Sequence, residues 1–163
     1  MIAYHVSNEK YEIGKIVTTN NYFDVTLRRG NEWVEKLLEN YRPRLYPNRL
    51  NCVFSFEKIE ALAFYSDRLN SNDLKYYEVE LLNNPVKCPM ILCGYIQENK
   101  DKELDLLSKY AIEYWISTMG WNFLELLCDS FKVVRQLNRP NITEKVMGMG
   151  LYEKDKSIAK TMK

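Results

Sequence analysis

Three groups of residues in this 163-residue chain have types that could do chemistry. His5 is the only histidine, so any step that needs an imidazole must use it. Phe54 and Tyr65 are aromatic residues separated by ten others, and two rings can hold a flat ligand between them by stacking. Glu125 stands in an apolar stretch at 123–127, where a carboxylate must find solvent, a partner or a cleft. Together they indicate a cleft that binds a flat, polar ligand.

Each residue also has an ordinary structural interpretation. A histidine between Tyr4 and Val6 on a strand is commonly a packed, hydrogen-bonded core residue, and the two aromatic residues taken alone would be core side chains. Glu78 and Glu80 are rival acids, although their alternation predicts the solvent face of a strand. The functional interpretation therefore rests on the combination and order of the residues.

That combination resembles the ADP-ribosyltransferase fold, in the His-Tyr-Glu branch that includes diphtheria toxin and the poly(ADP-ribose) polymerases. The resemblance rests on His5 in Tyr4-His5-Val6-Ser7, on the pair Phe54 and Tyr65, and on Glu125 in a late strand. It covers roughly residues 2–137, and the stretch 50–77 looks like the middle of small stand-alone bacterial and phage members. Each motif by itself is degenerate, so the resemblance rests on the order and spacing of the motifs.

The resemblance implies an NAD-dependent mono-ADP-ribosyltransferase that modifies a protein or nucleic-acid acceptor. NAD is then a substrate, and no metal is implied. The implied catalytic residues are Glu125, His5 and Tyr65. The implied NAD-binding residues are His5, Val6, Ser7, Arg49, Phe54, Ser55 and Tyr65.

Elementary chemistry agrees with these roles. Cleavage of the nicotinamide–ribose bond builds positive charge on the ribose, which a carboxylate in a dry cleft, here Glu125, would stabilise. Stacking between Phe54 and Tyr65 suits the flat, cationic nicotinamide ring. A neutral His5 would orient NAD by hydrogen bonding, and Arg49 or Arg44 would bind the pyrophosphate. The hypothesis requires the histidine, the tyrosine and the glutamate to converge on one cleft.

At two positions the chain departs from the family pattern, which limits how far the family's residue roles can be assigned to it. Phe54 stands where many members have tyrosine, which keeps the stacking face and removes a hydroxyl. Phe123, two residues before Glu125, removes the Glu-x-Glu or Gln-x-Glu pattern of arginine-directed toxins, so arginine is a less expected acceptor.

Other functions remain open at this point. One is an NAD glycohydrolase, and another is a non-enzymatic binding or inhibitor protein that keeps the fold and uses the tail after Pro140 or the helix with Trp33. RNA 2′-phosphotransferase chemistry ranks last, because it uses several basic residues around a phosphate and this chain shows no such set.

Composition restricts the class of protein. The formal net charge of +1 gives no global field that would attract nucleic acid or an anionic membrane. No apolar run approaches the ~20 residues that cross a bilayer. The four cysteines lack Cys-x-x-Cys spacing, so reduced, buried thiols are expected rather than a zinc site. We expect a soluble monomer in the cytoplasm of the producing cell or of an infected host, as a toxin or phage effector.

The hydrophobic pattern predicts a mixed α+β protein. The resemblance implies split antiparallel β-sheets around an NAD cleft, with flanking helices. We expect one ADP-ribosyltransferase-like domain at 1–139, and 140–163 as a polar C-terminal extension in the form of a helical fringe or loose tail. Ser55 is expected to cap the second helix. The expected strands are 2–6, 11–17, 50–54, 74–82, 90–96, 123–127 and 131–137. The expected helices are 31–40, 57–68 and one that follows the charged run 98–103.

Overall fold

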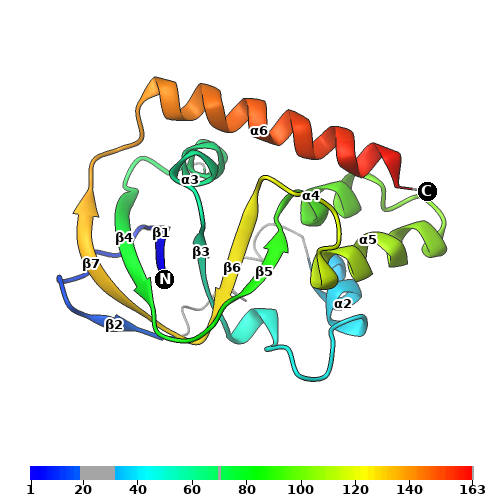
Figure 1. The fold of residues 1–163 in the computed structure, drawn as a ribbon, viewed down its shortest axis with the longest axis horizontal. Helices are drawn as coiled ribbons and strands as arrows, with labels where there is room; N and C mark the ends of the chain where they lie inside the picture. The colour runs from blue at the N-terminus through cyan, green and yellow to red at the C-terminus, as the bar shows by residue number, and fades with distance from the viewer. Residues whose placement is uncertain (19–31, 70, 163) are drawn as a thin grey trace.

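A computed structural model describes residues 1–18, 32–69 and 71–162, and it confirms the mixed α+β class. Seven antiparallel strands form a sheet in the order β2-β7-β4-β1-β3-β6-β5 (Figure 1). The strands are β1 (Ile2–Ser7), β2 (Ile16–Val17), β3 (Val53–Phe56), β4 (Lys75–Leu81), β5 (Val86–Pro89), β6 (Leu124–Cys128) and β7 (Phe131–Leu137). The described helices are α2 (Glu32–Asn40), α3 (Ile59–Ser66), α4 (Ile91–Glu98), α5 (Leu104–Ile116) and α6 (Ile142–Thr161), with a short 3₁₀ helix, η1 (Arg49–Asn51).

The pairing of β1 differs on its two sides. Against β4 it pairs along its whole length, from Ile2 opposite Glu80 to Ser7 opposite Lys75. Against β3 the register among the described residues is one pair, Tyr4 opposite Phe56. The sheet therefore consists of two well-paired parts that meet over a short β1–β3 contact.

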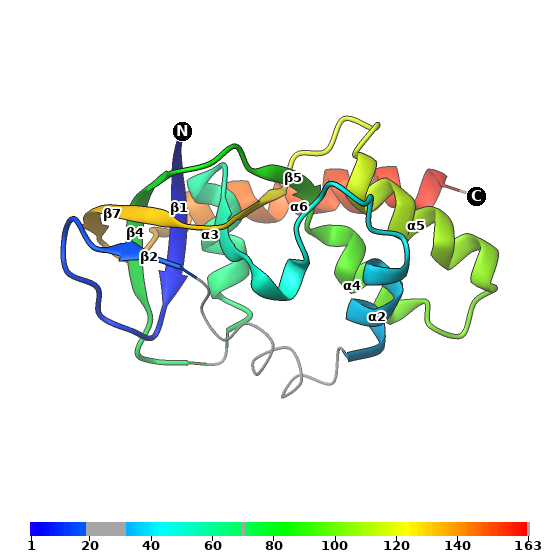
Figure 2. The ribbon, with the colours of Figure 1, turned by 90° about the horizontal axis from the view of Figure 1, so that it is seen from below.

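Helices cover this sheet unevenly. α3 lies over β1 and β3, and α6 runs along α3 towards α4 (Figure 1). α2, α4 and α5 gather at the β5 end (Figure 2). The buried apolar side chains of the described residues form separate clusters. One lies between the β5–β6 end of the sheet and these three helices, another lies within the β1–β4–β7 part, and a third lies under α3. Each buries one face of its elements, which is the main source of their stability.

Several sequence predictions of elements were wrong. The strand expected at 90–96 is helix α4, and the strand lies earlier, at Val86–Pro89, because a short apolar run does not distinguish a buried helix from a buried strand. The expected strand 11–17 is reduced to Ile16–Val17. Ser55 lies within β3, while Lys58 occupies the N-cap of α3 without a side-chain bond. β1 lies inside the sheet, between β4 and β3.

The C-terminal region is a 20-residue helix that packs on α3 and α4, so the helical alternative of the prediction is correct and the loose tail is wrong. Asn141 and Glu144 form a capping box at its start, a signal that is visible in the sequence. Asp155, which is fully buried, accepts hydrogen bonds from the backbone N–H groups of Asn122 and Phe123, so α6 fixes the residues that precede β6. In the described parts of the chain, no helix combines the length and apolar character needed to span a membrane.

The contact between α6 and α3 depends on a glycine. A Cβ at Gly148 would lie 2.4 Å from the backbone oxygen of Glu60, whereas a Cβ at Gly150 would meet nothing within 4 Å. We expect Gly148→Ala to lower the free energy of unfolding by about 1–3 kcal/mol, because backbone must move. The matched Gly150→Ala should raise it by about 0.5–1 kcal/mol through helix propensity. Urea denaturation of both variants measures this, and equal effects would contradict the tight helix contact.

Candidate functional site

Glu125 belongs to a buried polar group that we call the Arg49 cluster, made of Glu35, Arg49, Tyr114 and Glu125. Arg49 and the Tyr114 hydroxyl both donate to Glu125 Oε1, the hydroxyl at 2.5 Å. Arg49 Nε also donates to both carboxylate oxygens of Glu35, at 3.0 and 2.9 Å. Arg49 is 4% exposed and Glu125 5%. One guanidinium thus compensates two buried carboxylates.

The position of Arg49 follows from its local structure. Asn48 caps η1, since its side-chain oxygen accepts from the backbone N–H of Leu50 at 2.9 Å, and Arg49 begins this turn. Its guanidinium carbon lies 4.9 Å from the centre of the Phe54 ring and 5.3 Å from that of Tyr114. These aromatic faces favour a planar cation, so the cluster combines ion pairing with cation–π contact.

Burial also governs the phenol of Tyr114. Desolvation raises its pKa well above the ordinary value, and the charge of Arg49 opposes that shift without reversing it. The hydroxyl therefore keeps its proton and acts as a donor to Glu125. The structure places three of the sequence-predicted residues together here: Arg49, Phe54 and Glu125.

His5 occupies a different environment. Its Nδ1 donates to the backbone oxygen of Phe54 at 2.6 Å, and because a carbonyl can only accept, the proton is on Nδ1 and a neutral ring leaves Nε2 as an acceptor. Burial lowers the pKa of His5 to about 4, and its bond to the Phe54 carbonyl only partly offsets the shift. His5 Nε2 and Ser55 Oγ have no hydrogen-bond partner among the described residues.

The sheet register separates His5 from Glu125. Tyr4 lies opposite Phe56, and Phe56 lies opposite Glu125, so these three side chains share one face. His5, the next residue after Tyr4, points to the other face, where its ring lies 4.7 Å from that of Phe131. The structure therefore does not bring His5 and Glu125 into one cleft, contrary to the expected convergence.

The remaining predicted residues divide between these faces. Tyr65 packs on Phe56, with ring centres 5.0 Å apart, in the cluster under α3 that also contains Val6. Ser7 lies on the His5 side, where its hydroxyl is 3.3 Å from that of Tyr11. Tyr65 therefore lies on the same face of the sheet as Glu125. It packs in the cluster under α3, whereas Phe54 packs in the cluster at the β5–β6 end.

Sequence reasoning missed Glu35 and Tyr114. Glu35 is 9% exposed and lies among the apolar positions of α2, one turn before Leu38. An acidic residue inside an apolar helical stripe is a usable signal of a buried partner. Tyr114 gives no such signal, because it resembles every other aromatic residue on the buried face of α5.

Comparison with known proteins adds no assignment: no protein-family model matches the chain, and no curated protein is significantly similar to it. Within residues 1–18, 32–69 and 71–162, no group of three or more His, Cys, Asp or Glu side chains is arranged to hold a metal ion. The functional argument therefore rests on the side chains described above.

The depressed pKa of His5 predicts a pH dependence of stability. The folded protein keeps this ring neutral down to about pH 4, whereas the unfolded chain binds a proton near pH 6.5. Stability is therefore full above pH 6.5 and is lost as the pH falls towards 4, by up to about 3 kcal/mol. Denaturation of wild type and His5→Gln across pH 4–7.5 measures it. The same slope in both proteins would show that His5 is not the titrating group.

Arg49 should be far more important to stability than an exposed arginine. Arg49→Met leaves two buried carboxylates uncompensated, which should cost about 3–5 kcal/mol of unfolding free energy at pH 7. The control is Arg135→Met, because Arg135 also pairs with a glutamate, Glu78 at 2.8 Å, but its side chain is exposed. That change should leave stability nearly unaltered. Similar losses in the two variants, by chemical denaturation, would refute the assigned role of the cluster.

Proposed function

We propose that this protein is an NAD-dependent mono-ADP-ribosyltransferase of the ADP-ribosyltransferase fold, with a macromolecular acceptor. The observation that carries the proposal is Glu125, a buried strand carboxylate beside an arginine and an aromatic face. Such a carboxylate suits the stabilisation of a positively charged ribose, and the Phe54 ring suits the nicotinamide. The amino acid or base that accepts ADP-ribose stays open.

The order of the strands supports the proposal. β1, β3 and β6 are consecutive in the sheet and carry His5, Phe54 and Glu125 respectively. β6 leads through a short turn into β7, but in the described part of the chain β7 pairs with β4 and β2 and not with β6, so the hairpin partner expected after the glutamate strand is not formed. The brief β1–β3 contact is consistent with a split sheet, so the proposed NAD cleft is the junction of these strands.

In the proposed reaction the nicotinamide–ribose bond breaks, and its electron pair leaves with nicotinamide, which becomes neutral. The ribose carbon then carries oxocarbenium character until a nucleophile on the acceptor bonds to it. Glu125 would stabilise this charge and hydrogen-bond a ribose hydroxyl. Arg49 would compensate the charge of the pyrophosphate.

His5 has the protonation state that the proposal needs. Its lowered pKa makes the ring neutral near pH 7, and its Nε2 can accept a hydrogen bond from a ribose hydroxyl or an amide. Because His5 and Glu125 face opposite sides of the sheet, one NAD molecule contacts both only if β1 and β3 separate at their single register pair.

A second candidate is a non-enzymatic binding protein that keeps the fold. It is favoured by the engagement of Glu125 Oε1, which already accepts hydrogen bonds from Arg49 and Tyr114, and by the enclosure of His5 in the core. This candidate predicts no stabilisation by NAD in thermal unfolding and no nicotinamide release.

Glu125→Gln tests the enzymatic proposal. Wild type incubated with NAD should release nicotinamide, measured by liquid chromatography and mass spectrometry, and the variant should release it about 10²–10³-fold more slowly, because one preorganised electrostatic contact is lost. Nicotinamide release reports both transfer and hydrolysis.

The control is Glu78→Gln, which removes a strand carboxylate outside the Arg49 cluster and should keep wild-type activity. Circular dichroism confirms that both variants are folded. Undiminished release by Glu125→Gln would exclude the proposed role of this residue. No release by wild type, together with no thermal shift by NAD, would favour the binding protein.

A further inference from the structure

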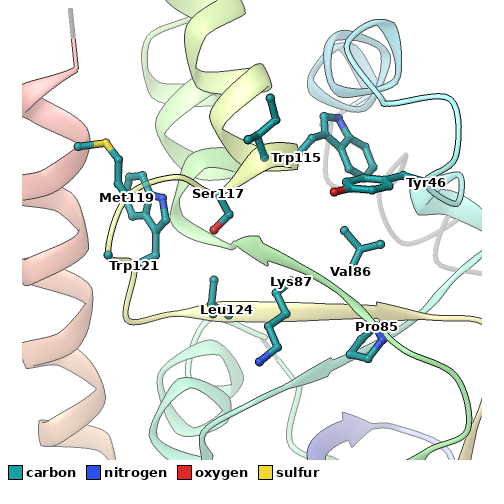
Figure 3. Close-up of a pocket in the computed structure, with 11 residues that line it drawn as sticks. Tyr46, Pro85, Val86, Lys87, Trp115, Ser117, Met119, Trp121 and Leu124 are labelled. Carbon is teal, nitrogen blue, oxygen red and sulfur yellow. The ribbon is translucent and has the colours of Figure 1, made fainter.

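A cavity of about 500 Å³ opens at the edge of the sheet, between β5 and the end of α5 (Figure 3). It is separate from the proposed NAD cleft at β1 and β3. Its size lies within the range of small-molecule pockets, roughly 300–1,000 Å³. Three aromatic residues, Tyr46, Trp115 and Trp121, line it together with Val86 and Leu124.

The loop 117–121 borders the cavity, and Glu113 holds it in place. Glu113, 7% exposed, accepts from the Thr118 hydroxyl at 2.6 Å, the Met119 backbone N–H at 2.8 Å and the Trp121 indole N–H at 2.8 Å. The Trp115 indole N–H is also occupied, by the Leu38 backbone oxygen at 2.7 Å. Trp115 is 1% exposed and Trp121 8%, so the two indoles brace a preformed wall, and Tyr46 is the partly exposed aromatic residue of the lining.

Ser117 is unusual at its position. It ends α5 in the left-handed conformation, with φ 53° and ψ 58°, where helices commonly use glycine. A serine here sacrifices backbone stability and places a hydroxyl at the cavity. Figure 3 shows Ser117 and the Tyr46 hydroxyl on opposite sides of the opening, both directed into it. The wall thus carries two neutral hydrogen-bonding groups.

The charged side chain among the described residues that line the cavity is already paired with a carboxylate. It is Lys87, whose Nζ lies 2.7 Å from Glu57 Oε1. In Figure 3 this amine points away from the opening. A charged ligand would lose its hydration here without gaining a free counter-charge, so the cavity favours neutral ligands.

We propose that this cavity binds a neutral, planar heteroaromatic ring with hydrogen-bonding edges, of the nucleobase class. The partly exposed ring of Tyr46 supplies flat contact area, and hydroxyls that both donate and accept match the alternating donors and acceptors of a base edge. Binding at this site does not require NAD cleavage. This proposal is therefore independent of the proposed enzymatic function.

Ligand-observed NMR with adenine, uracil and orotate tests the proposal on the full chain. Orotate is uracil with an added carboxylate, which makes it a matched anionic control. Adenine or uracil should bind saturably below about 1 mM, and orotate at least ~10-fold more weakly than uracil. Binding of neither neutral base, or tighter binding of orotate, would overturn the proposal.

Two variants locate the binding. Ser117→Gly should weaken binding of the bound base about 5-fold while raising the thermal unfolding midpoint by about 2–4 °C, since glycine suits the left-handed position. Tyr46→Phe keeps the ring and removes the hydroxyl, and it should also weaken binding about 5-fold. Unchanged affinity in both variants would show that the bases bind elsewhere and would refute the site.

Discussion

The structure depends on compensation of buried charge by Arg49. Its guanidinium contacts partners 14, 65 and 76 residues away in the sequence, so η1, α2, α5 and β6 are joined at one point. Leaving a buried carboxylate without its cation is strongly destabilising, so the Arg49 cluster constrains how these elements pack together. The same interaction holds the buried Glu125 side chain in place, so the residue that stabilises the helical end is also the one that contacts the proposed catalytic carboxylate.

Two other buried carboxylates hold the segment that precedes β6. Glu113 holds the loop that follows α5, and Asp155 on α6 binds the backbone immediately before the strand. Both carboxylates accept hydrogen bonds from N–H groups, and Glu113 also accepts one from the Thr118 hydroxyl. Glu125 therefore follows a segment anchored from two helices, which gives its side chain a defined starting position.

The sequence was a good guide where periodicity was strong. The alternation in β4 and the amphipathic pattern of α2 predicted their elements, and the order of His5, Phe54 and Glu125 matches three adjacent strands. It failed for α4, whose short apolar run suits either element, and for α6, whose burial depends on Gly148 meeting α3. The Arg49 cluster was only partly foreseen, because contacts between distant residues have no local pattern. The opposite facing of His5 and Glu125 depends on register, which a single sequence does not reveal.

The central claim is that Glu125 and the β1–β3 junction form an NAD site. A crystal structure of the Glu125→Gln variant with NAD tests it most directly, since slowed cleavage preserves the substrate. The account predicts the nicotinamide ribose within hydrogen-bond distance of the side chain at position 125, the nicotinamide ring against Phe54, and β1 and β3 separated near Tyr4. NAD bound away from these strands, with Arg49 and Glu35 engaged as before and the β1–β3 junction closed, would contradict it.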